Sequence, residues 1–187
     1  MKRNFLLIAM MAIFVLVGCN RAVKTTQDDV KKAEEAMFNG DLTANKEAVP
    51  DAIATFTKYV EDNPEAADAS EVLFKAVEIA VNTRQDPQQS IGLVNKLVAD
   101  YPKCDKNPVA LFMLATFVYD EQLHDLDKAR ETFQQIIDNY PESPFARDAE
   151  ISITQLGMTP EELIRMFEAQ AENWKLKAES WKLKTFY

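Results

Sequence analysis

The sequence predicts an all-α fold built from stacked helix pairs. Three segments with helical apolar periodicity each end at a proline, and a second set of apolar helices recurs between them at a similar spacing. No segment shows the alternation of apolar and polar residues, bounded by turns, that is typical of a β-strand. The chain of 187 residues, 47% of them hydrophobic, is long enough for one domain with a buried core.

The N-terminus reads as a secretory leader that ends at a lipid-attachment site. Lys2 and Arg3 precede an unbroken apolar run over residues 5–17, which is too short to span a bilayer as a stable helix. Residues 16–19 read Leu-Val-Gly-Cys, which is similar to the bacterial lipobox. This resemblance implies cleavage before Cys19 and lipidation of its thiol. The alternative is an ordinary secretory leader that contains an incidental cysteine.

Four segments are expected along the chain. They are a leader over residues 1–18, a lipidated tether over 19–27, a repeat domain over 28–157 and a C-terminal helix over 158–187. Asn20 follows the lipid site, where lipoproteins kept at the inner membrane commonly carry Asp. This resemblance implies an outer-membrane location, on the periplasmic face. Removal of the leader changes the net charge from −9 to −11.

The proline-terminated segments present one common helical face. They run over residues 52–64, 90–102 and 129–141, and each begins with a small residue. Apolar residues follow four, seven and eight positions later, which places them on one side of an α-helix. The small residue lets a neighbouring helix approach closely. The proline ends each helix because it cannot continue the backbone hydrogen bonds.

A partner helix precedes the second and third of these segments. Residues 71–82 align with residues 109–120 at an offset of 38, and Leu-Phe recurs in register. The unit is therefore a helix, a short loop, a second helix and a proline. One such unit cannot bury its apolar faces alone, but stacked units can.

Capping signals predict the remaining helices. A first partner helix is expected over residues 28–38, followed by a longer loop. Pro144 begins another helix, which stops at Gly157. Thr159 and Pro160, followed by two glutamates, are typical of the N-cap and first turn of a last helix that runs to about residue 184.

The repeat resembles the tetratricopeptide (TPR) family. Ala129, Phe133 and Pro141 stand at positions 0, +4 and +12 of one unit. The junction over residues 138–149 is similar to that of outer-membrane assembly lipoproteins (BamD/YfiO type) and Tol-Pal accessory proteins (YbgF type). Plain TPR units repeat about every 34 residues, so the extra residues here are expected in the turns. The resemblance implies a right-handed α-α superhelix of about three repeats, with the C-terminal helix as a cap.

The composition argues against most enzymes and against nucleic-acid binding. Four widely spaced glycines exclude glycine-rich phosphate loops. One histidine and two cysteines nearly exclude His/Cys metal clusters and catalytic triads. No cofactor or metal is therefore expected, and the acidic net charge argues against nucleic acid as a partner. His124 is expected to be a solvated loop residue, and Cys104 an unpaired thiol.

The expected function is a non-catalytic, lipid-anchored periplasmic scaffold that binds other envelope proteins, in outer-membrane assembly, secretion or Tol-Pal function. A surface-exposed lipoprotein that assists nutrient uptake is an alternative. A cell-wall hydrolase is a weaker one, since glycosidase chemistry needs paired carboxylates. The adjacent acids at 28–29, 34–35 and 161–162 are better explained as solvated helix faces with lysines nearby.

The resemblance to TPR proteins implies that the first helix of each pair lines a groove that holds a partner. Residues 114–115, Leu-Ala, stand where the family has its paired Leu-Gly. The expected groove residues are Glu71, Phe74, Glu78, Val81, Asn82, Val109, Phe112, Thr116, Tyr119 and Asp120. The alternative for Phe74 and Phe112 is packing between repeats.

The C-terminal helix carries a second candidate surface. Trp174 and Trp181 each begin the sequence Trp-Lys-Leu-Lys, and they share a helical stripe with Leu163 and Phe167. Four lysines accompany a single glutamate, Glu179, in this part of the chain. Two interpretations stay open. Either Leu163 and Phe167 cap the last repeat and the rest is solvated, or Trp174 and Trp181 dock on a partner protein or an anionic lipid surface.

Overall fold

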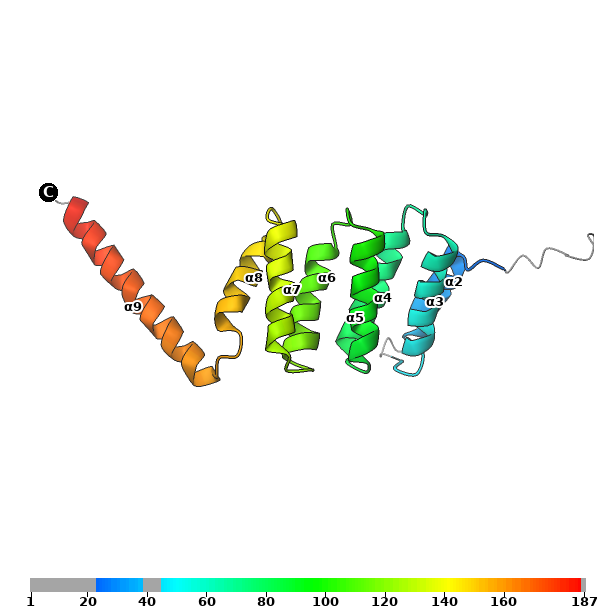
Figure 1. Cartoon of the computed structure of the whole chain (residues 1–187), viewed down its shortest axis with the longest axis horizontal. Helices are drawn as coiled ribbons and strands as arrows, with labels where there is room; N and C mark the ends of the chain where they lie inside the picture. Colours follow the sequence, from blue (N-terminus) through cyan, green and yellow to red (C-terminus); the bar gives the residue numbers. More distant parts are fainter. Residues whose placement is uncertain (1–22, 39–44, 186–187) are drawn as a thin grey trace, which may run out of the picture.

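A computed structural model describes residues 23–38 and 45–185 of the chain (Figure 1). The expected leader and the lipid-attachment residue Cys19 lie outside the described residues. Within the described part, no helix is both long and apolar enough to cross a membrane.

The described residues form a row of helices, and no β-strand occurs among them, which confirms the all-α prediction. In chain order the elements are α2 (Gln27–Ala36), α3 (Val49–Asp62), α4 (Ala69–Thr83), α5 (Pro87–Asp100), α6 (Asn107–Met113), the π-helix η1 (Leu114–Asp120), α7 (Leu126–Asn139), α8 (Pro144–Gln155) and α9 (Pro160–Thr185).

Successive helices pack as pairs, as the repeat predicts. The pairs are α2 with α3, α4 with α5, and α6 and η1 with α7, after which α8 packs on α7. Figure 1 shows α3, α5 and α7 along one side of the row, with α4 and α6 behind them. We call the first helices of the pairs, together with α8, the A-helices, and α3, α5 and α7 the B-helices.

The B-helices use the predicted positions in the core. Their small residues Ala52, Ser90 and Ala129 are at most 1% exposed. The apolar residues four positions later, which are Phe56, Val94 and Phe133, are also buried. Each helix ends two residues before its proline, and the residue after the helix donates its backbone N–H to a carbonyl one turn back.

The third A-helix differs from the others because it changes from α to π geometry at Leu114. Glu121 N–H donates to the Thr116 carbonyl and Leu123 N–H to the Val118 carbonyl, at 3.0 and 2.9 Å. Both bonds span five residues, whereas an α-helix bonds across four. The backbone therefore widens over one stretch of this helix.

The last helix extends away from the row instead of covering its end (Figure 1). Leu163 is half-buried, but Phe167 is 52% exposed. The expected cap is therefore wrong beyond the first turn of α9. The connection explains the direction of the chain: Leu156 is extended at the end of α8, and Gly157 follows in the left-handed region with φ +80°.

Candidate functional site

One stripe of each central A-helix faces away from the core. On α4 the stripe consists of Glu71, Lys75, Glu78 and Asn82. The equivalent residues 38 positions later, which are all half-buried, are Val109, Met113, Thr116 and Asp120. We call these two stripes together the A-helix face. It is mainly charged on α4 and becomes more apolar on α6 and η1.

The structure places the predicted groove residues in two groups. Glu71, Glu78, Asn82, Val109, Thr116 and Asp120 lie on the A-helix face, and Tyr119 is half-buried beside it. Burial raises the pKa of the Tyr119 hydroxyl. The prediction is wrong for Phe74 and Val81, which are 7% and 1% exposed and belong to the core.

Phe112 follows the alternative interpretation and packs between helices. Its ring centroid lies 5.3 Å from that of Phe133 on α7 and 5.6 Å from that of Phe145 on α8. The predicted groove did not include Lys75 and Met113, which lie on the A-helix face directly after the two phenylalanines. The charge of Lys75 was the available signal, because lysine is almost never fully buried unless it is paired.

Side-chain contacts hold neighbouring A-helices together along this face. The Lys75 ammonium lies 2.5 Å from a Glu34 carboxylate oxygen, which joins α4 to α2. At the other end of α4, the Arg84 guanidinium stacks 5.5 Å from the Phe117 ring centroid and pairs with Glu121 at 2.5 Å. These contacts set the spacing of the A-helices and do not cover the A-helix face.

The face ends in a hollow of about 510 Å³ between η1, α7, α8 and the start of α9. We call it the C-terminal hollow. It is lined by Thr116, Asp120, His124, Leu126, Phe133, Ser152, Gln155, Leu156, Gly157, Met158 and Leu163. Its lining combines apolar side chains with hydroxyl, amide and carboxylate groups, which suits a segment with one apolar anchor and polar neighbours.

The π-helix places an unsatisfied polar atom beside the C-terminal hollow. The Thr116 hydroxyl oxygen is buried and has no hydrogen-bond partner among the described residues. Threonine in an α-helix commonly bonds back to the carbonyl four residues earlier, as Thr132 does with Lys128 on α7 at 2.8 Å. Thr116 makes no such bond, so its buried hydroxyl is left without a partner at the edge of the hollow that the residue lines.

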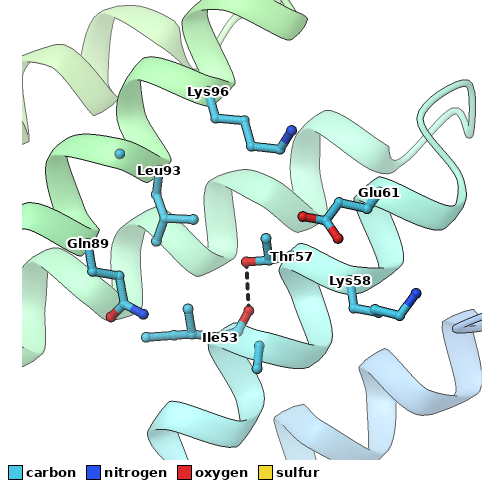
Figure 2. Close-up of a pocket in the computed structure, with 9 residues that line it drawn as sticks. Ile53, Thr57, Lys58, Glu61, Gln89, Leu93 and Lys96 are labelled. Carbon is cyan, nitrogen blue, oxygen red and sulfur yellow. Dashed lines mark hydrogen bonds between the residues drawn. The ribbon is translucent and has the colours of Figure 1, made fainter.

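A second hollow, of about 470 Å³, lies between α3 and α5 (Figure 2). Its floor includes the buried Ile53 and Leu93, while Glu61, Gln89 and Lys96 stand around it. Lys96 bonds to Asp100 on its own helix at 2.8 Å. This B-helix hollow contains no unsatisfied buried polar atom within the described residues, so the C-terminal hollow is the stronger candidate site.

The adjacent carboxylates form helix caps and surface ion pairs. Asp28 pairs with Lys32 at 2.6 Å, and Asp29 completes a capping box with Thr26. Glu162 accepts from the Thr159 N–H at the start of α9. His124 is exposed, and the part of the chain that the structure describes contains no group of side chains suited to a metal ion. These carboxylates therefore stabilise helices, by capping them and by pairing with lysines.

Comparisons with known proteins agree with the repeat architecture. The family model of YfiO, described as an outer membrane lipoprotein, matches residues 31–182, which is most of the chain. Comparison with curated proteins finds no significant match. The match begins within α2 and covers the rest of the three helix pairs, α8 and most of α9. The chain therefore belongs to the YfiO family of outer membrane lipoproteins.

Proposed function

We propose that this protein is a non-catalytic scaffold that binds a segment of another envelope protein on its A-helix face. In this proposal a lipid on Cys19 holds the scaffold at the periplasmic face of the outer membrane. Membership of an outer membrane lipoprotein family supports the location. The lipobox-like sequence at residues 16–19 supports the anchor.

The main observation that supports this binding site is the buried, unpartnered hydroxyl of Thr116, a residue that lines the C-terminal hollow. A buried polar group without a hydrogen bond costs about 1–3 kcal/mol. A bound segment that offers a donor or acceptor to Thr116 recovers this free energy. The π-helix that positions Thr116 is also a rare geometry that frequently occurs at functional sites.

The chemistry of the face indicates what the partner segment contains. The hollow offers apolar contact from Phe133, Leu156 and Leu163. An apolar side chain of the partner fits there, with a polar backbone or side-chain group beside it for Thr116. Along the face, Glu71 and Glu78 are exposed. A basic partner segment is therefore favoured by charge.

The experiment is site-specific photocrosslinking in intact cells. A photoreactive amino acid replaces Glu78 or Asp120 on the A-helix face, and Asn95 or Gln134 on the B-helices as matched exposed controls. The proposal expects one and the same protein to crosslink from Glu78 and Asp120 but from neither control. Thr116→Val, which keeps the shape of the side chain, is expected to weaken that crosslink.

Two results would contradict this function. The first is a partner that crosslinks only from the B-helix positions, and the second is a crosslink from Asp120 that Thr116→Val leaves unchanged. Protease treatment of whole cells tests the location separately. A periplasmic scaffold resists the protease until the outer membrane is opened, whereas a surface lipoprotein for nutrient uptake is cleaved at once.

A further inference from the structure

One face of α9 carries large apolar residues beyond its first turn, where the helix projects away from the row (Figure 1). Leu163 lies in the C-terminal hollow, and the same face continues through Phe167, Trp174 and Trp181 at steps that match the helical repeat. The exposed fractions of these last three residues are 52%, 70% and 71%. A large aromatic surface of this helix is therefore exposed to solvent.

The helix is too long for the protein's own last A-helix to cover it. α9 has 26 residues and α8 has 12, which correspond to about 39 and 18 Å of helix. If α9 folded back along α8, the part that contains Trp174 and Trp181 would still project beyond it. Among the described residues, α8 is therefore too short to cover this aromatic surface.

Charged residues around the stripe identify the kind of occupant. Lys175 and Lys177 follow Trp174 and flank the aromatic stripe, one on each side. The Lys177 ammonium lies 5.4 Å from the centre of the Trp174 ring. The acidic residues Glu172 and Glu179 fall on the opposite face. Aromatic rings between lysines are typical of helices that lie in a membrane interface, where the lysine stems extend to anionic headgroups.

We propose that the C-terminal half of α9 binds the surface of an anionic phospholipid membrane. Trp174 and Trp181 enter the headgroup region, and Lys175 and Lys177 pair with lipid phosphates. The acidic face, which also carries Leu176, stays in water. The helix lies on the membrane rather than across it, since no helix of the described chain is apolar enough to span one.

The position of α9 gives this contact a consequence for orientation. α2 and α9 lie at opposite ends of the row of helices (Figure 1). A lipid at Cys19 and a membrane-bound α9 would attach both ends, so that the row lies along the membrane. This goes beyond the proposed function, because partner binding on the A-helix face does not require α9 to touch lipid.

The test uses the chain from residue 20 to residue 187, which keeps every described residue and has no acyl group. The only two tryptophans of the protein, Trp174 and Trp181, are both on α9, so tryptophan fluorescence reports on this helix alone. Vesicles of phosphatidylcholine with phosphatidylglycerol are expected to shift the emission to shorter wavelength. Pure phosphatidylcholine vesicles are expected to have little effect, and high salt should reverse the shift.

A charge variant and a matched control test the lysines. Lys175→Glu with Lys177→Glu keeps both tryptophans and is expected to weaken vesicle binding by more than about tenfold. Lys31→Glu with Lys103→Glu makes the same charge change at exposed positions of the repeat domain and should bind as the parent does. Circular dichroism melting checks that both variants keep the fold.

Three outcomes overturn the proposal. They are no spectral shift with anionic vesicles, equal binding to both kinds of vesicle, and a shift that grows with protein concentration without lipid. The last would identify a second copy of this chain as the occupant. None of these outcomes bears on the crosslinks from Glu78 and Asp120, so the two proposals can fail separately.

Discussion

The rings of Phe112 and Phe133 meet edge to face, with their planes at 61° and their centroids 5.3 Å apart. Phe112 comes from α6 and Phe133 from α7, and Phe145 of α8 lies on the other side of Phe112. This aromatic cluster joins α6 to α7 and α8, and α7 and α8 both line the C-terminal hollow. Phe112 therefore has a structural role, although the groove hypothesis assigned it to a partner.

Phe112→Ala is expected to lower the free energy of unfolding by about 3 kcal/mol. The substitution removes a large, half-buried side chain and two aromatic contacts. Urea titration followed by circular dichroism measures the change. Asn82→Ala is the control, because this exposed residue lies on the A-helix face, and its effect is expected to stay within about 0.5 kcal/mol. Equal stabilities of the two variants would show that Phe112 does not hold the helices together.

Gly92→Ala is expected to raise the free energy of unfolding by about 0.5–1 kcal/mol. Gly92 lies inside α5 beside the B-helix hollow, and an added Cβ would meet nothing within 4 Å. Alanine favours the helix and restricts the unfolded chain. Thermal melting measures the effect. A lower melting temperature would mean that the hollow between α3 and α5 closes further than the structure shows.

The carboxylate of Asp62, at the end of α3, binds the backbone of Thr25 just before α2, and this contact is sensitive to acid. Lys58 and then the Thr25 N–H, at 2.6 and 2.8 Å, hold the pKa of this carboxyl at about 2, below its ordinary 3.8. The pKa of Asp62 is lower in the folded state than in the unfolded chain. The stabilising effect of these contacts is therefore complete above about pH 4 and is lost as the pH falls towards 2. The protection factor of the Thr25 amide against hydrogen exchange is expected to fall over this window.

Asp62→Asn tests this pH dependence. The variant is expected to show a smaller change in the free energy of unfolding between pH 4 and pH 2, measured by urea titration at several pH values. Asp148→Asn, which changes one exposed carboxylate on α8, is the matched control. If both variants follow the parent over this range, Asp62 does not contribute to the acid response.

Cys19→Ser is expected to abolish acylation and normal processing of the leader. The reason is that Cys19 closes the lipobox-like sequence and provides the thiol for lipid attachment. Incorporation of labelled palmitate in growing cells measures the effect. Cys104→Ser, which changes the other cysteine, should remain labelled. Label that persists in the Cys19 variant would rule out this residue as the lipid site.

The B-helices were predictable because their signals are local. Small residues such as Ala129 and prolines such as Pro141 mark the close helix contact and the helix end, and both follow from backbone sterics. The structure confirms the burial of Ala129 and the end of α7 at Asn139. The overall class and repeat arrangement therefore followed from the sequence.

The details of the candidate site depend on contacts between elements. Phe74 and Val81 are buried because α4 packs against several helices, which leaves only a narrow stripe that includes Lys75. The apolar stripe on α9 could be predicted from the sequence, but helical periodicity does not show whether another helix packs on Phe167. The π geometry of η1 has no local sequence signal comparable to a proline or a cap.

The widened turn of η1 directly precedes a change in the length of the repeat. The third A-helix follows the second at an offset of 38 residues, yet Ala129 follows Ser90 at an offset of 39. A π-helical turn holds more residues than an α-helical turn, so the wider geometry and the loop after it can take up an additional residue. One additional residue is thus accommodated between η1 and α7 while Ala129 of α7 keeps its buried position. The shape of the hollow is then open to change through chain length as well as through side-chain identity.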